Sequence, residues 1–192
     1  RAEIRKRTKA PRIRRQQLMQ EAEGYLDLIM ATSEQSPLNS SLRCRMAQCA
    51  IDTLERLGPD EYNHGRACYL RGQAFRFMGQ FNYAIDALAR SADYDPCNIH
   101  IHLALAWCFK RIGRIDLAIE SMEDALEVDS RLGIVHYNLA CYWSLASNVG
   151  LTLAHLARAF ELDADYRSHV VHEADFDPVR SHPEFLALTS VI

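Results

Sequence analysis

Two histidines near the end of the chain have a spacing that would suit a metal site. His169 and His172 are three residues apart, so on a helix their side chains would share a face, and Glu173 and Asp175 follow closely. Imidazole and carboxylate groups are common zinc ligands. The pattern offers no clear third ligand of fixed spacing, however, and no partner that would orient the imidazoles.

The remaining candidates for chemistry are weaker. His100 and His102 are two residues apart and would point to different faces of a helix. The sequence contains no nucleophile elbow, no phosphate-binding loop and no dinucleotide-binding fingerprint. Acidic residues are numerous, but none form a pair within an apolar stretch. We therefore expect a protein that is not an enzyme, with no catalytic residue, no cofactor and no metal.

The cysteines also argue against redox or metal chemistry. They are scattered, without a Cys-x-x-Cys pair, and most fall at apolar positions of predicted helices, where cysteine acts as a small hydrophobic residue. Unpaired cysteines are typical of a reducing compartment, which predicts a cytoplasmic protein. The six are Cys44, Cys49, Cys68, Cys97, Cys108 and Cys141. The sequence also lacks an apolar run of about 18–20 residues that would cross a bilayer, so we expect no membrane span.

The element that must position any functional residue is a pattern repeated every 34 residues over 65–166. Small, aromatic, turn and acidic residues recur in register, and a period of this length indicates a repeat array instead of one closed core. Four of the columns are Gly72, Ala106 and Ala140; Phe75, Phe109 and Trp143; Gly79, Gly113 and Ser147; and Asp95, Asp129 and Asp163.

Each repeat carries two apolar stripes of helical period, which in the first copy span 67–78 and 82–94. The break between them is Gly79-Gln80, because glycine readily adopts the left-handed conformation at a helix end. Asp95-Pro96 ends the second helix, since a residue before proline is disfavoured in the α conformation. One repeat cannot bury both of its faces, so the repeats should stack into an all-α superhelix with a concave side.

These columns resemble the tetratricopeptide repeat, and the first copy matches its consensus best. The residues that carry the resemblance are Gly72, Phe75, Gly79, Phe81, Ala84, Leu88 and Pro96. In the second copy Ser130 replaces the proline, and in the third Thr152 replaces an alanine. The stretches 137–141 and 175–185 are similar to bacterial members of the family. The resemblance implies a right-handed α-α superhelical solenoid whose usual role is to bind other proteins.

The resemblance also implies where a partner would bind. In such a solenoid the first helix of each repeat lines the concave groove, and large amphipathic or basic side chains there favour a peptide with apolar anchors and some acidic character. The predicted binding set is Arg66, Tyr69, Gln73, Arg76, Phe77, His100, Leu103, Trp107, Lys110, Arg111, Ile134, Tyr137, Asn138, Cys141 and Ser144.

We expect six segments along the chain. Residues 1–15 form a basic arm, 16–64 a degenerate helix pair that caps the array, and 167–192 a C-terminal cap. The three repeats between the caps are 65–98, 99–132 and 133–166.

The two capping segments should consist mainly of helix. A first helix is expected over 12–34 and a second over about 38–57. In the C-terminal cap, a short helix over 166–174 and a final one starting at Pro183 should place Phe176, Val179, Phe185 and Leu186 across the last helical face.

The basic arm suggests an alternative partner. Residues 1–15 hold eight Lys or Arg and one Glu, a net charge of +7, whereas the rest of the chain carries −10. Such an arm could contact nucleic acid or an anionic surface, but no aromatic residues alternate with its charges. A solvated helix start or linker, or an arm docked on the acidic body, would explain it equally well, so we do not expect nucleic acid as the main partner.

The pattern as a whole favours a non-catalytic adaptor that binds a peptide or protein of unknown identity in the concave groove. A small chaperone for client proteins and association through the arm 1–15 remain alternatives, and exposed ends would suit a homodimer. The chain begins at Arg1 and not at methionine. We therefore expect a processed chain or a fragment, and a regulatory tail on an upstream enzyme is a further alternative.

Overall fold

The computed structural model describes the backbone of residues 2–35, 39–62 and 64–190, and every regular element in these ranges is a helix. Side chains are described for 12–31, 39–59, 61–62 and 64–190, so most of the predicted basic arm lies outside the described side chains. The chain divides into an N-terminal unit, Arg1–Pro96, and a C-terminal unit, Cys97–Ile192, each described by itself.

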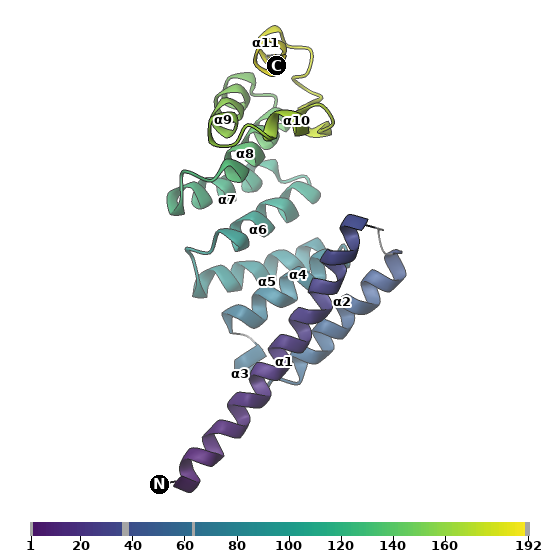
Figure 1. Cartoon of the computed structure of the whole chain (residues 1–192), viewed down its shortest axis with the longest axis vertical. Helices are drawn as coiled ribbons and strands as arrows, with labels where there is room; N and C mark the ends of the chain where they lie inside the picture. Colours follow the sequence, from purple (N-terminus) through teal and green to yellow (C-terminus); the bar gives the residue numbers. More distant parts are fainter. Residues whose placement is uncertain (1, 36–38, 63, 191–192) are drawn as a thin grey trace. The chain divides into compact units, whose positions relative to one another are not determined.

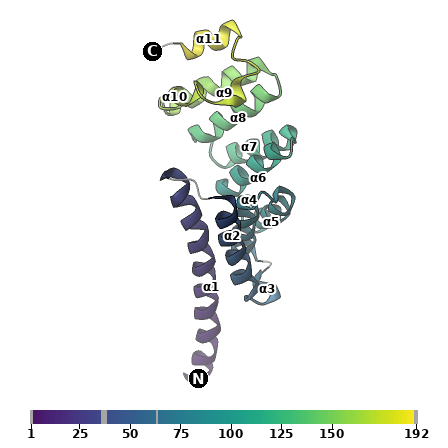
Figure 2. The same cartoon turned by 90° about the vertical axis from the view of Figure 1, so that its right-hand side faces the viewer.

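The N-terminal unit contains two helix pairs. Helix α1 (Ala2–Gln35) lies along α2 (Ser40–Glu55), and after the short α3 (Pro59–Tyr62) the chain forms the pair α4 (Gly65–Phe77) and α5 (Phe81–Tyr94) (Figures 1 and 2). Helix α2 also packs on α4, so the second helix of the first pair contacts the first helix of the next.

The core between α1, α2 and α4 follows directly from helical spacing. Helix α1 buries Leu18, Ala22, Leu26 and Ile29, which recur every three or four residues on one face. This helix begins about ten residues earlier than we predicted and runs through Pro11. A proline removes only one backbone donor from a helix, so it kinks or weakens a long helix without necessarily ending it.

The C-terminal unit contains two further pairs and the chain's last segment. Helices α6 and α7 form one pair, α8 and α9 the next, and α7 packs on α8 just as α2 packs on α4. The bounds are α6 Ile99–Arg111, α7 Ile115–Val128, α8 Gly133–Leu145, α9 Val149–Leu162, α10 Tyr166–Val170, the 3-10 helix η1 Ala174–Phe176 and α11 Pro183–Thr189.

The turn inside each repeat is built in the same way three times. Its central residue has a positive φ, which is 74° at Gly79, 77° at Gly113 and 58° at Ser147. A backbone hydrogen bond then reaches back five residues across the turn, from Gln80 to Phe75, from Arg114 to Phe109 and from Asn148 to Trp143, each at 2.9 Å. The column that predicted the break thus marks a left-handed helix end, with serine in place of glycine in the third copy.

The last segment of the chain, residues 166–190, belongs to the core of the C-terminal unit. Phe176, Val179 and Phe185 are buried there, as predicted, and Pro183 is the first residue of α11. The expectation for Leu186 is wrong, because its side chain is half exposed. Its neighbour Phe185 already fills the contact with the core, and adjacent positions on a helix point in different directions.

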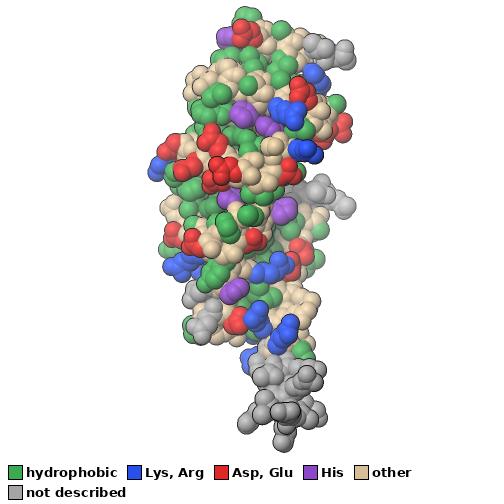
Figure 3. Space-filling view, turned by 90° about the vertical axis from the view of Figure 1, so that its left-hand side faces the viewer, with side chains coloured by type: hydrophobic (Ala, Val, Ile, Leu, Met, Phe, Trp, Pro, Cys, Tyr) green, Lys and Arg blue, Asp and Glu red, His purple; other side chains and the backbone are tan. Residues whose placement is uncertain are grey.

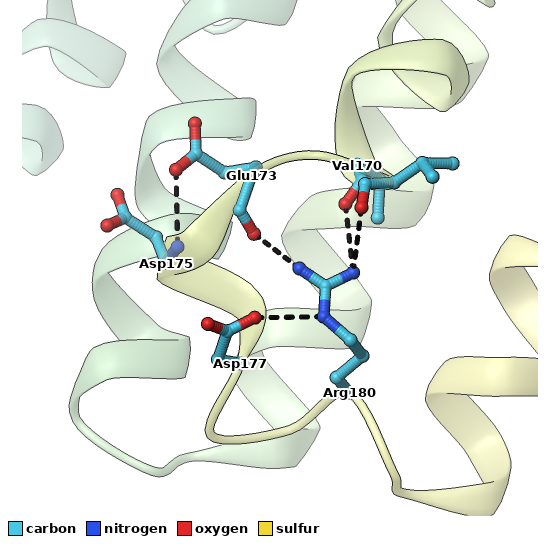
Figure 4. A network of polar contacts seen from close by, with 6 residues as sticks. Val170, Glu173, Asp175, Asp177 and Arg180 are labelled. Atoms are coloured by element: carbon cyan, nitrogen blue, oxygen red, sulfur yellow. Dashed lines mark hydrogen bonds and ion pairs between the residues drawn. The ribbon is translucent and has the colours of Figure 1, made fainter.

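Arg180 holds the loop of this segment in place. Its guanidinium donates hydrogen bonds to the carbonyl oxygens of Val170, Val171 and Glu173 at 3.3, 3.3 and 2.6 Å, and it pairs with the Asp177 carboxylate at 2.9 Å (Figure 4). These three carbonyls, at and just after the end of the five-residue helix α10, therefore have hydrogen-bond donors. Among all helices in the described ranges, none has the length and apolar character needed to cross a membrane.

Candidate functional site

The predicted binding residues lie on three helices. Arg66, Tyr69, Gln73, Arg76 and Phe77 are on α4 in the N-terminal unit. The others are on α6 and α8 in the C-terminal unit, namely His100, Leu103, Trp107, Lys110 and Arg111 on α6 and Ile134, Tyr137, Asn138, Cys141 and Ser144 on α8.

On α4 most of the predicted surface is partly covered. Tyr69, Gln73 and Arg76 are half-buried, and Tyr69 packs against the core formed with α1 and α2. Arg66 is exposed and forms an ion pair with Glu23 of α1. This face therefore offers polar edges beside α1, with its apolar parts directed toward the core.

On α6 four of the five predicted residues form a partly exposed stripe. His100, Leu103, Trp107 and Arg111 recur at intervals of three and four residues, so they share one face of the helix. Trp107 is 38% exposed, so part of a large apolar side chain is accessible on this face. The guanidinium carbon of Arg111 lies 5.6 Å from the centroid of the Trp107 ring, within the range of a cation–π contact.

On α8 the C-terminal segment covers part of the predicted surface. Tyr137 is only 7% exposed, and its ring stacks on Tyr166 at 5.0 Å between centroids and meets the edge of Phe176 at 5.8 Å. Cys141, one helical turn further along, is 2% exposed. These two side chains face the chain's own tail, whereas Ile134 at the start of α8 remains 39% exposed.

A polar cluster lies where η1 meets α6 and α8. Donor atoms of Cys141, Glu173 and Asp175 all lie within 4.8 Å of one another. The ammonium of Lys110 pairs with the Asp175 carboxylate, and the Glu173 carboxylate accepts a hydrogen bond of 3.2 Å from the Asp175 backbone N–H. The hydroxyl of Tyr137 is buried and has no hydrogen-bond partner among the described residues.

Burial and the carboxylates of this cluster raise the pKa values of the Cys141 thiol and the Tyr137 hydroxyl. Burial raises the pKa of the Cys141 thiol, and the carboxylates of Asp175 and Glu173 raise it further. The pKa of the Tyr137 hydroxyl is raised by burial first and then by Cys141, Glu173 and Asp175. Both groups are therefore neutral at physiological pH, in surroundings that carry an excess of negative charge.

A second pair of titratable side chains joins α8 to α9. The Nδ1 atoms of His136 and His155 are 3.1 Å apart, and His136 Nε2 lies 3.1 Å from the carbonyl oxygen of Ser130. A carbonyl oxygen can only accept, so His136 Nε2 donates to it, and the second hydrogen bond runs between the two Nδ1 atoms. Burial, together with His136, lowers the pKa of His155.

Sequence reasoning assigned Glu173 and Asp175 to the wrong neighbours. We considered them beside His169 and His172, but both histidines are exposed, and the His169 ring packs edge-on against Tyr137 and Tyr166. The carboxylates instead meet Cys141, more than thirty residues earlier in the chain. One indication of this contact was present in the sequence, because the stretches 137–141 and 175–185, which contain Cys141 and Asp175, both carried the family resemblance.

Charges on the described surface are mixed. The space-filling view shows acidic and basic side chains interspersed with hydrophobic ones, and histidines at several points along the visible face (Figure 3).

The prediction that the cysteines are buried holds in part, because Cys68, Cys108 and Cys141 are buried while Cys49 and Cys97 are exposed. No disulfide joins any of the six within the described part of the chain.

Comparison with known proteins confirms the repeat family and the fold class. A family model of the tetratricopeptide repeat matches residues 65–96 and 99–131, which correspond to the first two predicted repeats. A relative, anaphase-promoting complex subunit 3 of Dictyostelium discoideum, is 34% identical over 59 residues, or 30% of this chain. The match covers 6% of that protein, so it compares one short stretch of a much longer chain.

Solved structures with the same architecture include several of MamA. MamA of AMB-1 aligns with a TM-score of 0.59 at 20% identity, covering 81% of this chain and 92% of that one. MamA residues 41 to the end, from Desulfovibrio magneticus RS-1, aligns with a TM-score of 0.57 at 16% identity, covering 82% of this chain and 95% of that one. At such identities the likeness is one of fold, an all-α array of stacked helix pairs.

Proposed function

We propose that this chain, which is a tetratricopeptide-repeat protein, is a non-catalytic adaptor that holds a peptide or protein segment against the first helices of its repeats. The repeat family supports a role in protein–protein interaction in general. The particular surface is inferred from the exposure and chemistry of the residues on those helices.

The observation that carries the proposal is the stripe on α6. A half-exposed tryptophan with an arginine over its ring is a common arrangement in protein interfaces, where Trp and Arg contribute much of the binding energy. Leu103 supplies apolar surface beside Trp107, and His100 and Arg111 supply polar edges. A partner with an apolar anchor and acidic neighbours would complement this stripe.

The other residues of the predicted binding set differ in whether they are exposed enough to contact a partner. Ile134 and Asn138 on α8 extend the surface within the C-terminal unit, and the polar edge of α4 is a candidate surface of the N-terminal unit. Tyr137 and Cys141 support the surface from beneath the C-terminal segment and do not touch the partner directly. A cytoplasmic location goes with this role and is favoured by the thiols, of which two are exposed.

A matched set of variants tests the surface. Ile134 on α8 is 39% exposed and Leu151 on α9 is 38% exposed, so truncating either to alanine removes a similar apolar side chain from a similar environment. Immobilised wild-type protein, Trp107→Ala, Ile134→Ala and Leu151→Ala are used to capture partners from a lysate of the source cells, and captured proteins are compared quantitatively. Partners of the proposed surface are lost with Trp107→Ala and Ile134→Ala and retained with Leu151→Ala.

Fluorescence gives the affinity once a partner is identified. Trp143→Phe leaves Trp107 as the single tryptophan, so its emission reports binding at α6. A hot-spot tryptophan contributes about 2 kcal/mol or more, so Trp107→Ala should weaken binding by roughly thirtyfold. Because this variant lacks the reporter, its affinity and that of Leu151→Ala are measured by isothermal titration calorimetry. Equal affinity of Trp107→Ala and Leu151→Ala for every captured partner would exclude this surface.

A second candidate function rests on the arm. Helix α1 is continuous from Ala2, so residues 2–15, with most of the +7 charge of the first fifteen, start a long helix. A helix with this charge density could bind a polyanion. Fluorescence anisotropy with labelled duplex DNA would then show an affinity that falls steeply with salt and is lost on deleting residues 1–14. A salt-insensitive partner that survives the deletion would favour the α6 surface instead.

A further inference from the structure

We propose that Cys141, Glu173 and Asp175 form a binding site for a zinc-type divalent cation, with the hydroxyl of Tyr137 as a neutral fourth donor. The site lies within the C-terminal unit, where η1 and the residues before it close over α8. It is separate from the binding stripe on α6, and it does not depend on the proposed adaptor function.

The first observation is the convergence of donors. One ligand atom of each of the three residues lies within 4.8 Å of the other two, although they come from α8 and from the tail. In a tetrahedral zinc site with bonds of about 2.0–2.3 Å, donor atoms are roughly 3.3–3.8 Å apart. The three donors therefore need to approach by only about 1 Å, which small changes in side-chain torsion can supply.

The second, independent observation is the Tyr137 hydroxyl. The side chain is more than nine-tenths buried, and within the part of the chain that the structure describes its oxygen has no hydrogen-bond partner. Leaving a buried hydroxyl unpaired costs about 1–3 kcal/mol, so native proteins seldom do so without a reason. Tyr137 lies one helical turn before Cys141 on α8, and its ring centroid is 5.8 Å from that of Phe176, the residue after Asp175, so the side chain borders the same cluster.

The third observation is charge. Lys110 balances one of the two carboxylates through its ion pair with Asp175, and with the thiol protonated the cluster retains one uncompensated negative charge. Binding a divalent cation expels the thiol proton to solvent, and the sulfur–metal bond replaces the sulfur–hydrogen bond. The charges of the three anionic ligands, the divalent ion and Lys110 then sum to zero, so the ion pair of Lys110 with Asp175 can remain.

The donor set selects the type of metal. A thiolate favours zinc and similar borderline ions, whereas magnesium and calcium prefer six or more oxygen ligands. The tail that brings Glu173 and Asp175 to the site is already fixed by Arg180, which binds the Glu173 carbonyl at 2.6 Å and the Asp177 carboxylate at 2.9 Å (Figure 4). Such fixed ligands reduce the ordering cost of binding.

Cobalt titration of the full chain tests the site. Protein stripped with a chelator is titrated with Co²⁺ and followed by the near-ultraviolet charge-transfer band of a cobalt–thiolate bond, and Zn²⁺ affinity is then measured by competition with a chromogenic chelator. We expect saturation at one equivalent with a charge-transfer band. Cys141→Ser should abolish the band, and Glu173→Gln and Asp175→Asn should each weaken zinc binding by about tenfold or more.

Controls separate this site from other metal-binding groups. Cys97→Ser removes an exposed thiol outside the cluster, and His172→Gln removes an exposed histidine; both proteins should bind as wild type does. Far-UV circular dichroism of every variant confirms that it is folded. The proposal is overturned if folded wild-type protein shows no saturable Co²⁺ binding, or if folded Cys141→Ser binds with unchanged affinity and spectrum.

Discussion

Replacing Phe176 by alanine should cost the C-terminal unit a large part of its stability. The side chain is fully buried, its ring centroid lies 5.5 Å from that of Phe185 and 5.8 Å from that of Tyr137, and it comes from a 3-10 helix of only three residues. Such a short element contributes little by itself, so we expect the contacts of the phenyl ring to contribute much of the stability of η1 against α8. Truncating a buried phenylalanine costs about 3–5 kcal/mol.

This loss should be local. In a repeat array each pair of helices is stabilised mainly by its nearest neighbours, so the destabilisation is expected in α8, α9 and the tail, with little change in α1 and α2. Native-state hydrogen exchange, read by mass spectrometry on peptides from each helix, measures this distribution. Urea unfolding followed by circular dichroism gives the accompanying change in midpoint.

Leu186→Ala is the matched control for Phe176→Ala. It removes an apolar side chain from the same C-terminal segment, but that side chain is half exposed, so the expected change is within about 0.5 kcal/mol. If Phe176→Ala lowers stability by less than about 1 kcal/mol, or no more than Leu186→Ala does, the tail is not part of the core. Docking of the tail could then no longer explain why Tyr137 is buried.

Two further predictions concern helix packing and protonation. Gly72→Ala should lower the free energy of unfolding, because the new Cβ would lie 2.6 Å from Leu88 Cγ. The overpacking cost of about 1–3 kcal/mol exceeds the gain in helix propensity of about 1 kcal/mol. Gly24→Ala, where the new Cβ has open space, should instead raise the free energy of unfolding by about 0.5–1 kcal/mol. Both are measured by chemical unfolding, and a stabilising Gly72→Ala would refute the packing argument. Because the pKa of His155 is lowered in the folded state, the unfolded chain binds more protons below pH of about 6.5, so thermal stability should fall as pH falls from there. His155→Gln should flatten that pH dependence, and an unchanged slope would show that the pair with His136 does not contribute to it.

The regular part of the fold was predictable because it depends on local pattern. Stripes at 67–78 and 82–94 predicted α4 and α5, which span 65–77 and 81–94. The turn column predicted three helix ends, including the one at Ser147, where no glycine occurs. Helical period, turn residues and the 34-residue repeat all act over a few neighbouring residues, so sequence alone contains this information.

The placement of the tail was less predictable because it has no period. The sequence indicated that apolar residues near 176–186 would cover the last helical face, and three of the four do so. It gave no indication that η1 would meet α6 and α8 closely enough to bury Tyr137 and to pair Lys110 with Asp175. Those contacts join residues that are far apart in the chain, and only the three-dimensional docking of an irregular segment determines them.

One column of the repeat has a different residue type in each of the three repeats, and these types fit the proposal that α6 binds a partner while the tail covers α8. Gln73, Trp107 and Cys141 occupy the same position in successive repeats, yet their surroundings differ. On α6 the position is occupied by a half-exposed tryptophan, while on α8, beneath the C-terminal segment, it is occupied by a small buried cysteine. A tryptophan at position 141 would collide with η1, and a cysteine at 107 would leave the stripe without its largest apolar group. Under the proposed function, the tail covers the position on α8 and a partner would cover the position on α6, so replacing Trp107 is the most direct test of that proposal.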